Sequence, residues 1–416
     1  MNDEAQHERA RVGTSVRSWI PFRRLAESQL AHAVGDGMVA IALANTLFFA
    51  APIGEARDKV ALYLAVTMTP FAVLSPVIGP WLDRRRGGYR VAIVISTAGR
   101  ALLAVLLSSR TERLALYPLA FGLLVLSRVH GVSRSALVPD AVPPGRQLMW
   151  GNAWLAVTSV LGAAVGAGIA AAANALQGPG LALGLAAGVF ACGVVPAWRL
   201  PRVKGEGEPH TAVEDYRQLL SGRLRAGGLA MAATRASVGF LTFLLAFVLK
   251  DAGETGRGFA LVVAAAAVGG FVGSVVAPVL RAALRESLLL LVSLGAVGVV
   301  ALWAARSFDV GAAALVAAVV GFAAGAGRLA FDSLLQHDAP EAVRGRTFAR
   351  YETIFQLWWV GGAGLATAVP FRSAGGMRTL AVIAGAGLLL SVRGLIRGRE
   401  SRRGDRDLEQ VRAAGR

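Results

Sequence analysis

Apolar runs of roughly 20 residues alternate with short basic connectors along the chain, and no other feature constrains its fold as strongly. The hydrocarbon core of a bilayer is ~30 Å thick, so a helix that crosses it needs ~20 apolar residues. Only helices and closed barrels satisfy all backbone hydrogen bonds in lipid. Barrel strands would appear as alternating segments of ~10 residues. These runs are continuous and rich in Ala, Leu and Val, so they predict transmembrane α-helices.

The overall composition agrees with a membrane protein. Hydrophobic residues make up 55% of the chain and charged residues 17%, whereas soluble domains have about 45–50% and 25%. The net charge of +17 does not predict nucleic-acid binding, because the basic residues cluster in alternate connectors. Arginine greatly outnumbers lysine and the chain is rich in Ala and Gly, which is typical of a bacterial genome of high GC content.

Twelve membrane spans follow from the apolar runs, and they are 25–51, 60–81, 90–109, 115–138, 150–173, 180–198, 226–249, 258–280, 287–305, 309–333, 348–370 and 377–396. With both termini inside, 29 of the 43 Lys and Arg residues fall in cytoplasmic segments or the adjoining span ends, and 9 in outer loops or the adjoining span ends. This asymmetry is the positive-inside pattern. We therefore expect a multi-pass protein of a bacterial inner (plasma) membrane with both termini in the cytoplasm.

The predicted fold is an all-α membrane protein of two pseudo-symmetric six-helix bundles. We expect a cytoplasmic segment (1–24), an N-terminal bundle (25–198), a cytoplasmic linker (199–225), a C-terminal bundle (226–396) and a basic cytoplasmic tail (397–416). The tail is solvated in this interpretation, with some attraction to anionic lipid.

An internal repeat supports the division into two bundles. Asp140 and Arg146 follow the fourth span, and Asp338 and Arg344 follow the tenth, each Arg six residues after its Asp. Gly166 and Gly364 lie twenty residues beyond those arginines. Parallel repeats of this kind are the plan of one large class of transporters.

The connector between the second and third spans carries a more specific pattern. It contains Gly79, Asp83 and Arg84, followed by a basic tail that includes Arg90. With the repeat and the span count, this segment resembles the loop motif of the major facilitator superfamily. The resemblance implies an alternating-access transporter in which these four residues act in gating; a plain cytoplasmic turn is the alternative for Asp83 and Arg84.

Three shorter segments resemble the branch of that family that exports drugs, macrolides and siderophores. They are Gly35-Asp36-Gly37, Ser-Arg-Ser-Ala-Leu-Val-Pro-Asp at 133–140, and Val-Arg-Gly-Arg-Thr-Phe-Ala-Arg at 343–350. This resemblance implies proton antiport. The chain lacks the Gly-Pro pair of the antiporter motif in its fifth span.

Charged residues inside a membrane are costly and are therefore candidates for function. Asp36 is either a proton carrier or a helix-positioning group that pairs with Arg100. Arg128 either tunes a carboxylate or substrate site or forms a structural ion pair. His130 either titrates or is a hydrogen-bonded core residue, and Arg235 is a candidate partner for Asp36.

The remaining candidates have structural or gating roles. Arg328 and Asp332 lie four residues apart, a spacing at which two helical side chains can pair, so they predict a structural or gating ion pair. Small residues let helices approach closely, which predicts packing roles for a set of glycines. That set is Gly162, Gly166, Gly168 and Gly364.

No catalytic or metal site is predicted. The lysines do not fit a P-loop, the five His are scattered and the one Cys is isolated, so we expect no enzyme activity, no metal and no cofactor. The predicted function is secondary active export of small amphipathic molecules, with protons as the coupling ion, by a monomer. The alternatives are uptake or lipid transport in the same fold, or a membrane receptor or scaffold that does not transport.

Overall fold

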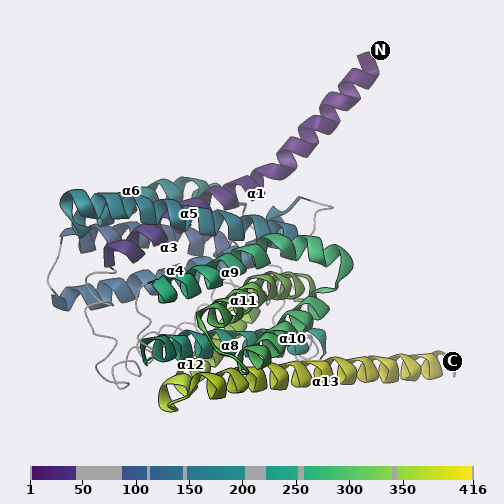
Figure 1. Cartoon of the computed structure of the whole chain (residues 1–416). Helices are drawn as coiled ribbons and strands as arrows, with labels where there is room; N and C mark the ends of the chain where they lie inside the picture. The colour runs from purple at the N-terminus through teal and green to yellow at the C-terminus, as the bar shows by residue number, and fades with distance from the viewer. Residues whose placement is uncertain are drawn as a thin grey trace. The chain divides into compact units, whose positions relative to one another are not determined.

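The computed structural model describes residues 2–43, 87–109, 113–143, 148–201, 222–251, 257–339 and 344–414. Within these ranges the chain forms eleven helices and no strand (Figure 1). The helices are α1 (Asn2–Leu43), α3 (Gly88–Ser109), α4 (Arg113–Ala141), α5 (Leu148–Gln177), α6 (Pro179–Trp198), α8 (Arg223–Asp251), α9 (Arg257–Ala283), α10 (Glu286–Ala304), α11 (Val310–Asp338), α12 (Arg344–Ala368) and α13 (Ser373–Ala414).

The predicted all-α membrane fold is confirmed. Each helix corresponds to one predicted span; the predicted span 60–81 lies outside the described residues. Eight of the described helices are long and apolar enough to cross a bilayer. The other three, α1, α4 and α12, carry the polar residues of the sites below. The first and last helices are longer than predicted, since α1 begins at Asn2 and α13 continues to Ala414.

The outer surfaces of these helices are apolar. Leu176, Val279 and Val382 expose between 69% and 79% of their surface, and many other Val and Leu residues are also exposed. Soluble monomers rarely expose contiguous apolar surface of this extent. The exposed side chains therefore fit a lipid environment.

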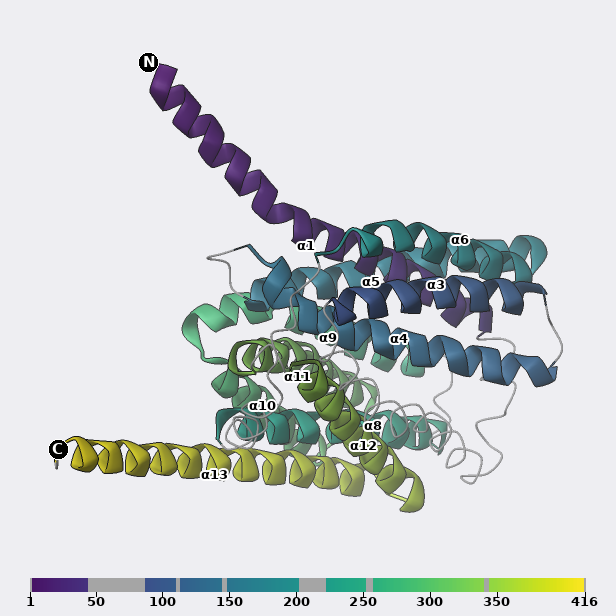
Figure 2. The same cartoon turned by 180° about the vertical axis from the view of Figure 1, so that it is seen from behind.

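The chain forms two compact units. The first contains α1, α3, α4, α5, α6 and residues 344–350 at the start of α12, and the second contains α8 to α11, the rest of α12 and α13. Within the first unit, α3 to α6 lie side by side, and within the second, α13 lies along α8 and α10 (Figures 1 and 2). The boundaries predicted from the sequence place all of α12 in the C-terminal bundle, and they stay a prediction.

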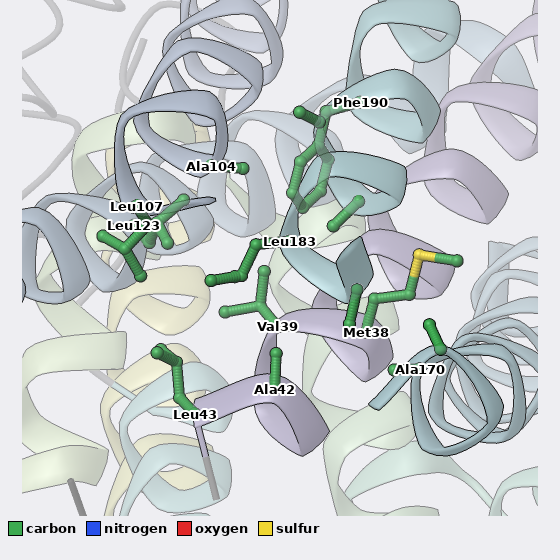
Figure 3. Close-up of a cluster of buried hydrophobic side chains, with 14 of the residues drawn as sticks. Met38, Val39, Ala42, Leu43, Ala104, Leu107, Leu123, Ala170, Leu183 and Phe190 are labelled. Atoms are coloured by element: carbon green, nitrogen blue, oxygen red, sulfur yellow. The ribbon is translucent and has the colours of Figure 1, made fainter. Parts of the chain in front are cut away.

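A buried apolar cluster holds the first unit together. Figure 3 shows side chains of α1, α3, α4, α5 and α6 converging in it, among them Met38, Leu107, Leu183 and Phe190. Lipid tails are as apolar as these side chains, so close packing contributes more than removal from water does. The cluster fixes the part of α1 that carries Asp36.

Glycines bring several helix backbones into direct contact. A Cβ atom on Gly166 of α5 would overlap the carbonyl oxygen of Val34 on α1. The same relation joins α9 to α11, where Cβ atoms on Gly269 and Gly321 would overlap the carbonyl oxygens of Ala318 and Ala266. These helix pairs meet backbone to backbone, with no side chain between them.

The start of α11 gives a modest test of local stability. The Asp309 side chain accepts a hydrogen bond of 2.6 Å from the backbone nitrogen of Ala312 and so caps the helix. We expect Asp309→Ala to lower the free energy of unfolding by about 1 kcal/mol, measured by thermal unfolding in detergent. Asp309→Asn retains the capping oxygen and should match the wild type; equal losses in both variants would contradict the capping role.

Candidate functional site

Asp36 of α1 lies at the centre of a polar cluster within the first unit. Its Oδ1 accepts a hydrogen bond from Nη2 of Arg100 on α3. Its Oδ2 lies 3.1 Å from Nε2 of His32 and accepts a hydrogen bond of 3.3 Å from Oγ of Ser127 on α4. Three helices thus converge on one carboxylate, and the pairing of Asp36 with Arg100 that the sequence allowed is present.

Arg100 is the most deeply buried of these charged groups, with 1% of its surface exposed. Its Nη1 lies 2.5 Å from Nδ1 of His32, and its guanidinium carbon lies 4.2 Å from the centre of the Phe190 ring on α6. A buried cation requires a counter-ion and hydrogen-bond acceptors. Asp36 supplies the charge, His32 an acceptor, and Phe190 the face of an aromatic ring.

Two buried histidines stack within this cluster. The rings of His32 and His130 have centroids 3.8 Å apart and are nearly parallel, with 5° between their planes. His130 is 1% exposed, and its Nδ1 has no hydrogen-bond partner among the described residues. The predicted candidate His130 therefore belongs to the site through His32, which the sequence analysis missed. His32 could have been found from its position four residues before Asp36, on the same helix face.

The other predicted cations lie elsewhere. Arg128 of α4 is exposed, and it is Arg100 that contacts the Asp36 carboxylate. Ser127 reaches Asp36 from α4, and Arg128, the next residue, points about 100° further round the helix. Arg235 is half-buried on α8 in the second unit. Its suggested pairing with Asp36 stays a prediction.

A second buried ion cluster lies in the second unit. Nε of Arg328 on α11 is 3.0 Å from Oδ2 of Asp332, and Nη1 of Arg328 is 2.5 Å from Oε2 of Glu352 on α12. The predicted pair of Arg328 and Asp332 is therefore present. Glu352, which was not among the predicted site residues, joins it and links two helices.

The predicted gating loop is only partly described. Gly79, Asp83 and Arg84 lie outside the described residues. Arg90 lies on α3, with its guanidinium carbon 5.0 Å from the centre of the Trp198 ring of α6. This contact positions Arg90 within the first unit; its gating role stays a prediction.

The corresponding connector of the second unit is held by an acid that sequence analysis missed. Asp83 lies four residues after Gly79, whereas the residue four after Gly273 in this connector is Ala277, which is not an acid. Arg281 instead contacts Glu286, the first residue of α10, with 2.7 Å between Nε and Oε1. Arg223 approaches Glu286 at 3.8 Å from the start of α8.

One contact joins residues from the two copies of the repeated Asp and Arg pattern. Nη1 of Arg344, from the second copy, lies 3.5 Å from Oδ2 of Asp140, from the first copy. Residues 344–350 belong to the first unit, so this contact is internal to it. Burial raises the pKa of Asp140, which lies beyond the predicted fourth span, and the charge of Arg344 partly opposes that rise.

The predicted packing glycines divide into two groups. Gly162 and Gly166 face α1, and a Cβ on Gly162 would lie 2.9 Å from Cβ of Ala33. For Gly168 and Gly364 no described atom lies within 4 Å of such a Cβ, so the predicted tight packing is not seen there. Each residue turns about 100° around a helix, which moves Gly168 off the face that Gly166 shares with α1. On α12 the tightly packed glycine is Gly362, against Ala236.

Comparison with known proteins identifies the family. A family model described as Major Facilitator Superfamily matches residues 28–363. An uncharacterized protein of Mycobacterium leprae is 34% identical over 374 residues, which cover 80% of this chain and 64% of that protein. The chain thus spans slightly less than two thirds of that relative. An uncharacterized MFS-type transporter of Mycobacterium bovis is 29% identical, with 85% of this chain and 86% of that protein covered.

A solved structure shows the same fold. The crystal structure of a bacterial homologue of the iron transporter ferroportin, in its outward-facing state, has a TM-score of 0.67 at 20% sequence identity. The match covers 91% of this chain and 99% of that structure. With the family match and the apolar helices, this chain is a multi-pass membrane protein, and it belongs to the major facilitator superfamily.

Proposed function

We propose that this transporter exports small amphipathic molecules by alternating access, driven by protons that move inward across a bacterial inner membrane. The observation that carries the proposal is the contact of Asp36, Arg100 and His32 inside the membrane helices of one unit. A charge in the membrane is retained where it serves an ion or substrate path. A carboxylate beside an imidazole also brings together two groups that can take up and release a proton.

The direction of transport is inferred from the resemblance of three segments to the drug, macrolide and siderophore exporters. One of them contains Asp36, and another ends at Asp140. The basic connectors support cytoplasmic termini. We further propose that the chain works as a monomer, with the domain boundaries predicted from the sequence.

The residues of this site do not fit a divalent metal, although the solved relative is a homologue of an iron transporter. Oδ1 of Asp36 and Nδ1 of His32 are both hydrogen-bonded to Arg100, so neither atom is free to bind a metal in this arrangement. The guanidinium would also repel a cation. Among the described residues there is no group of three or more His, Cys, Asp or Glu side chains arranged to hold a metal ion.

Export can be tested by growth inhibition followed by reconstitution. Cells with and without the protein are compared across ethidium, macrolides and other amphipathic compounds, and the compound with the largest protection is taken into proteoliposomes. We expect flux against the direction of an imposed proton gradient. In Asp36→Asn we expect flux no greater than in protein-free liposomes, because the variant cannot hold the charge that balances Arg100.

Asp309→Asn is the matched control, since it removes a carboxylate from the same protein and keeps the helix cap. It should transport as the wild type does. Flux that ignores the gradient would contradict proton coupling, and flux in the same direction as the protons would contradict export.

A further inference from the structure

The hydrogen bonds around His32 fix its tautomer. A guanidinium only donates hydrogen bonds, so Nδ1 of His32 accepts from Nη1 of Arg100 at 2.5 Å and carries no proton. The single proton of the neutral ring is then on Nε2, which points at Oδ2 of Asp36 from 3.1 Å. In this conformation His32 is neutral and donates to the carboxylate.

Arg100 consequently covers two positions at which this site could take up a proton. One of its amino groups donates to Nδ1 of His32, the only lone pair of that ring, and the other donates to Oδ1 of Asp36. A proton can enter His32 only after the guanidinium leaves Nδ1. Proton uptake by His32 and the hydrogen bond from Arg100 to its Nδ1 are therefore mutually exclusive.

The Asp36 carboxylate lies among membrane helices with 38% of its side chain exposed. A charge inside a membrane is stabilised by a neighbouring cation, and the site contains two side chains that can serve. We propose that the coupling proton is carried as an imidazolium of His32, which replaces the Arg100 guanidinium as the counter-ion of Asp36. A proton from water binds the Nδ1 lone pair, the two hydrogen bonds from Arg100 break, and the Nε2–H bond to Asp36 is retained. The proposal rests on the proposed proton coupling and names the atom that holds the proton.

The groups around His32 suit this exchange. The charged and titratable side chains facing it are Asp36 on α1, Arg100 on α3, and His130 and Arg134 on α4, while α6 presents Phe190. Arg100 and Arg134 act on both rings with their positive charge, so an added proton favours departure of the movable guanidinium. The stacked ring of His130 offers an aromatic face to an imidazolium.

Buried polar atoms next to the stacked rings offer positions for the water that delivers the proton. Asp36 meets Ser127 and His32 meets His130, so α1 and α4 run antiparallel at this point. One turn further along each helix are Ser28 and Ser133, both fully buried. Their hydroxyls have no hydrogen-bond partner among the described residues, and such groups in protein interiors commonly bind water.

The protonation state of His32 can be read by ¹⁵N NMR of protein labelled at its five histidines and reconstituted in lipid. His32→Gln assigns the His32 signals. At neutral pH we expect the wild type to show His32 as the neutral Nε2–H tautomer. In Arg100→Gln we expect the doubly protonated imidazolium, and in Arg100→Gln combined with Asp36→Asn the neutral ring again, because the charge that holds the second proton is gone.

Arg90→Gln is the control for loss of a positive charge from the same helix, and it should leave His32 neutral. A neutral His32 in folded Arg100→Gln would overturn the proposal. So would an imidazolium that persists in the double variant, because its proton would then be independent of Asp36.

Infrared spectroscopy tests the proposal without removing Arg100. On acidification of the wild type, we expect no protonated-carboxyl band from Asp36 before His32 becomes charged. In His32→Gln that band should appear, since Asp36 is then the remaining acceptor, and Asp36→Asn assigns it. A protonated Asp36 beside a neutral His32 in the wild type would overturn the proposal. Both spectroscopic tests are independent of transport. They therefore determine which residue holds the proton even if the proteoliposome experiment rejects proton-driven export.

Discussion

Replacement of Arg328 by methionine is expected to lower the free energy of unfolding by about 3–5 kcal/mol, because it removes the cation that two largely buried carboxylates contact. Arg328 contacts Asp332 at 3.0 Å and Glu352 at 2.5 Å. Only 3% of the Asp332 side chain and 16% of the Glu352 side chain are exposed. Methionine fills much of the same volume, so the loss reports on charge and not on a cavity. Unfolding in detergent by heat or denaturant measures it.

Two further variants separate this effect from general damage. Removing all three charges in Arg328→Met/Asp332→Asn/Glu352→Gln should recover most of the stability, since no uncompensated charge remains. Arg223→Met removes an arginine whose contacts are longer, at 3.8 Å and 3.9 Å, and whose side chain is 41% exposed; it should cost less than about 1 kcal/mol. If the triple variant is no more stable than Arg328→Met, uncompensated charge is not the cause of the loss.

Gly166→Val is expected to prevent normal packing of α1 on α5, with a loss of about 1–3 kcal/mol or more. The added Cβ would overlap the carbonyl oxygen of Val34. A backbone carbonyl cannot rotate aside as a side chain can, so the helices must separate. Val34 lies two residues before Asp36, and the separation would also displace the Asp36 cluster. We expect reduced yield of monodisperse protein in size-exclusion chromatography and a lower unfolding temperature.

Gly168→Val gives the matched comparison on the same helix. No described atom lies within 4 Å of a Cβ at this position, so this variant should behave as the wild type does. Similar losses in both variants would show that α5 tolerates no larger residue at all, and that the contact with Val34 is not the determining one.

Much of the fold follows from the sequence because the bilayer leaves few choices. Length and hydropathy alone located the eleven described helices to within a few residues, except at the two ends of the chain, where polar helix continues beyond the membrane segment. Hydropathy identifies membrane spans, but it gives no signal for a polar helix that lies in water. The pairing of Asp36 with Arg100 was also accessible, because a charge in the membrane requires a partner and few were available.

The contacts within the candidate site could not be predicted in the same way. They depend on which face of each helix packs against which neighbouring helix, and a single sequence does not give that information. Arg128 was favoured from its depth in the fourth span, whereas the adjacent Ser127 is the residue that reaches Asp36. His32 was missed because its role arises from contact with α3 and α4. Glu352 was not among the predicted site residues, because its partner, Arg328, lies 24 residues away on another helix.

The glycine contacts between backbones limit how this protein can change shape. Where Gly166 of α5 lies on Val34 of α1, and where Gly269 and Gly321 lie between α9 and α11, backbone atoms meet with no side chain that could adopt a second rotamer. At these contacts each pair of helices should therefore move as one rigid unit during the transport cycle. Bending and sliding should instead occur at surfaces where longer side chains meet. A substitution at one of these glycine contacts should reduce the amount of folded, active protein before it reduces the transport rate of that protein.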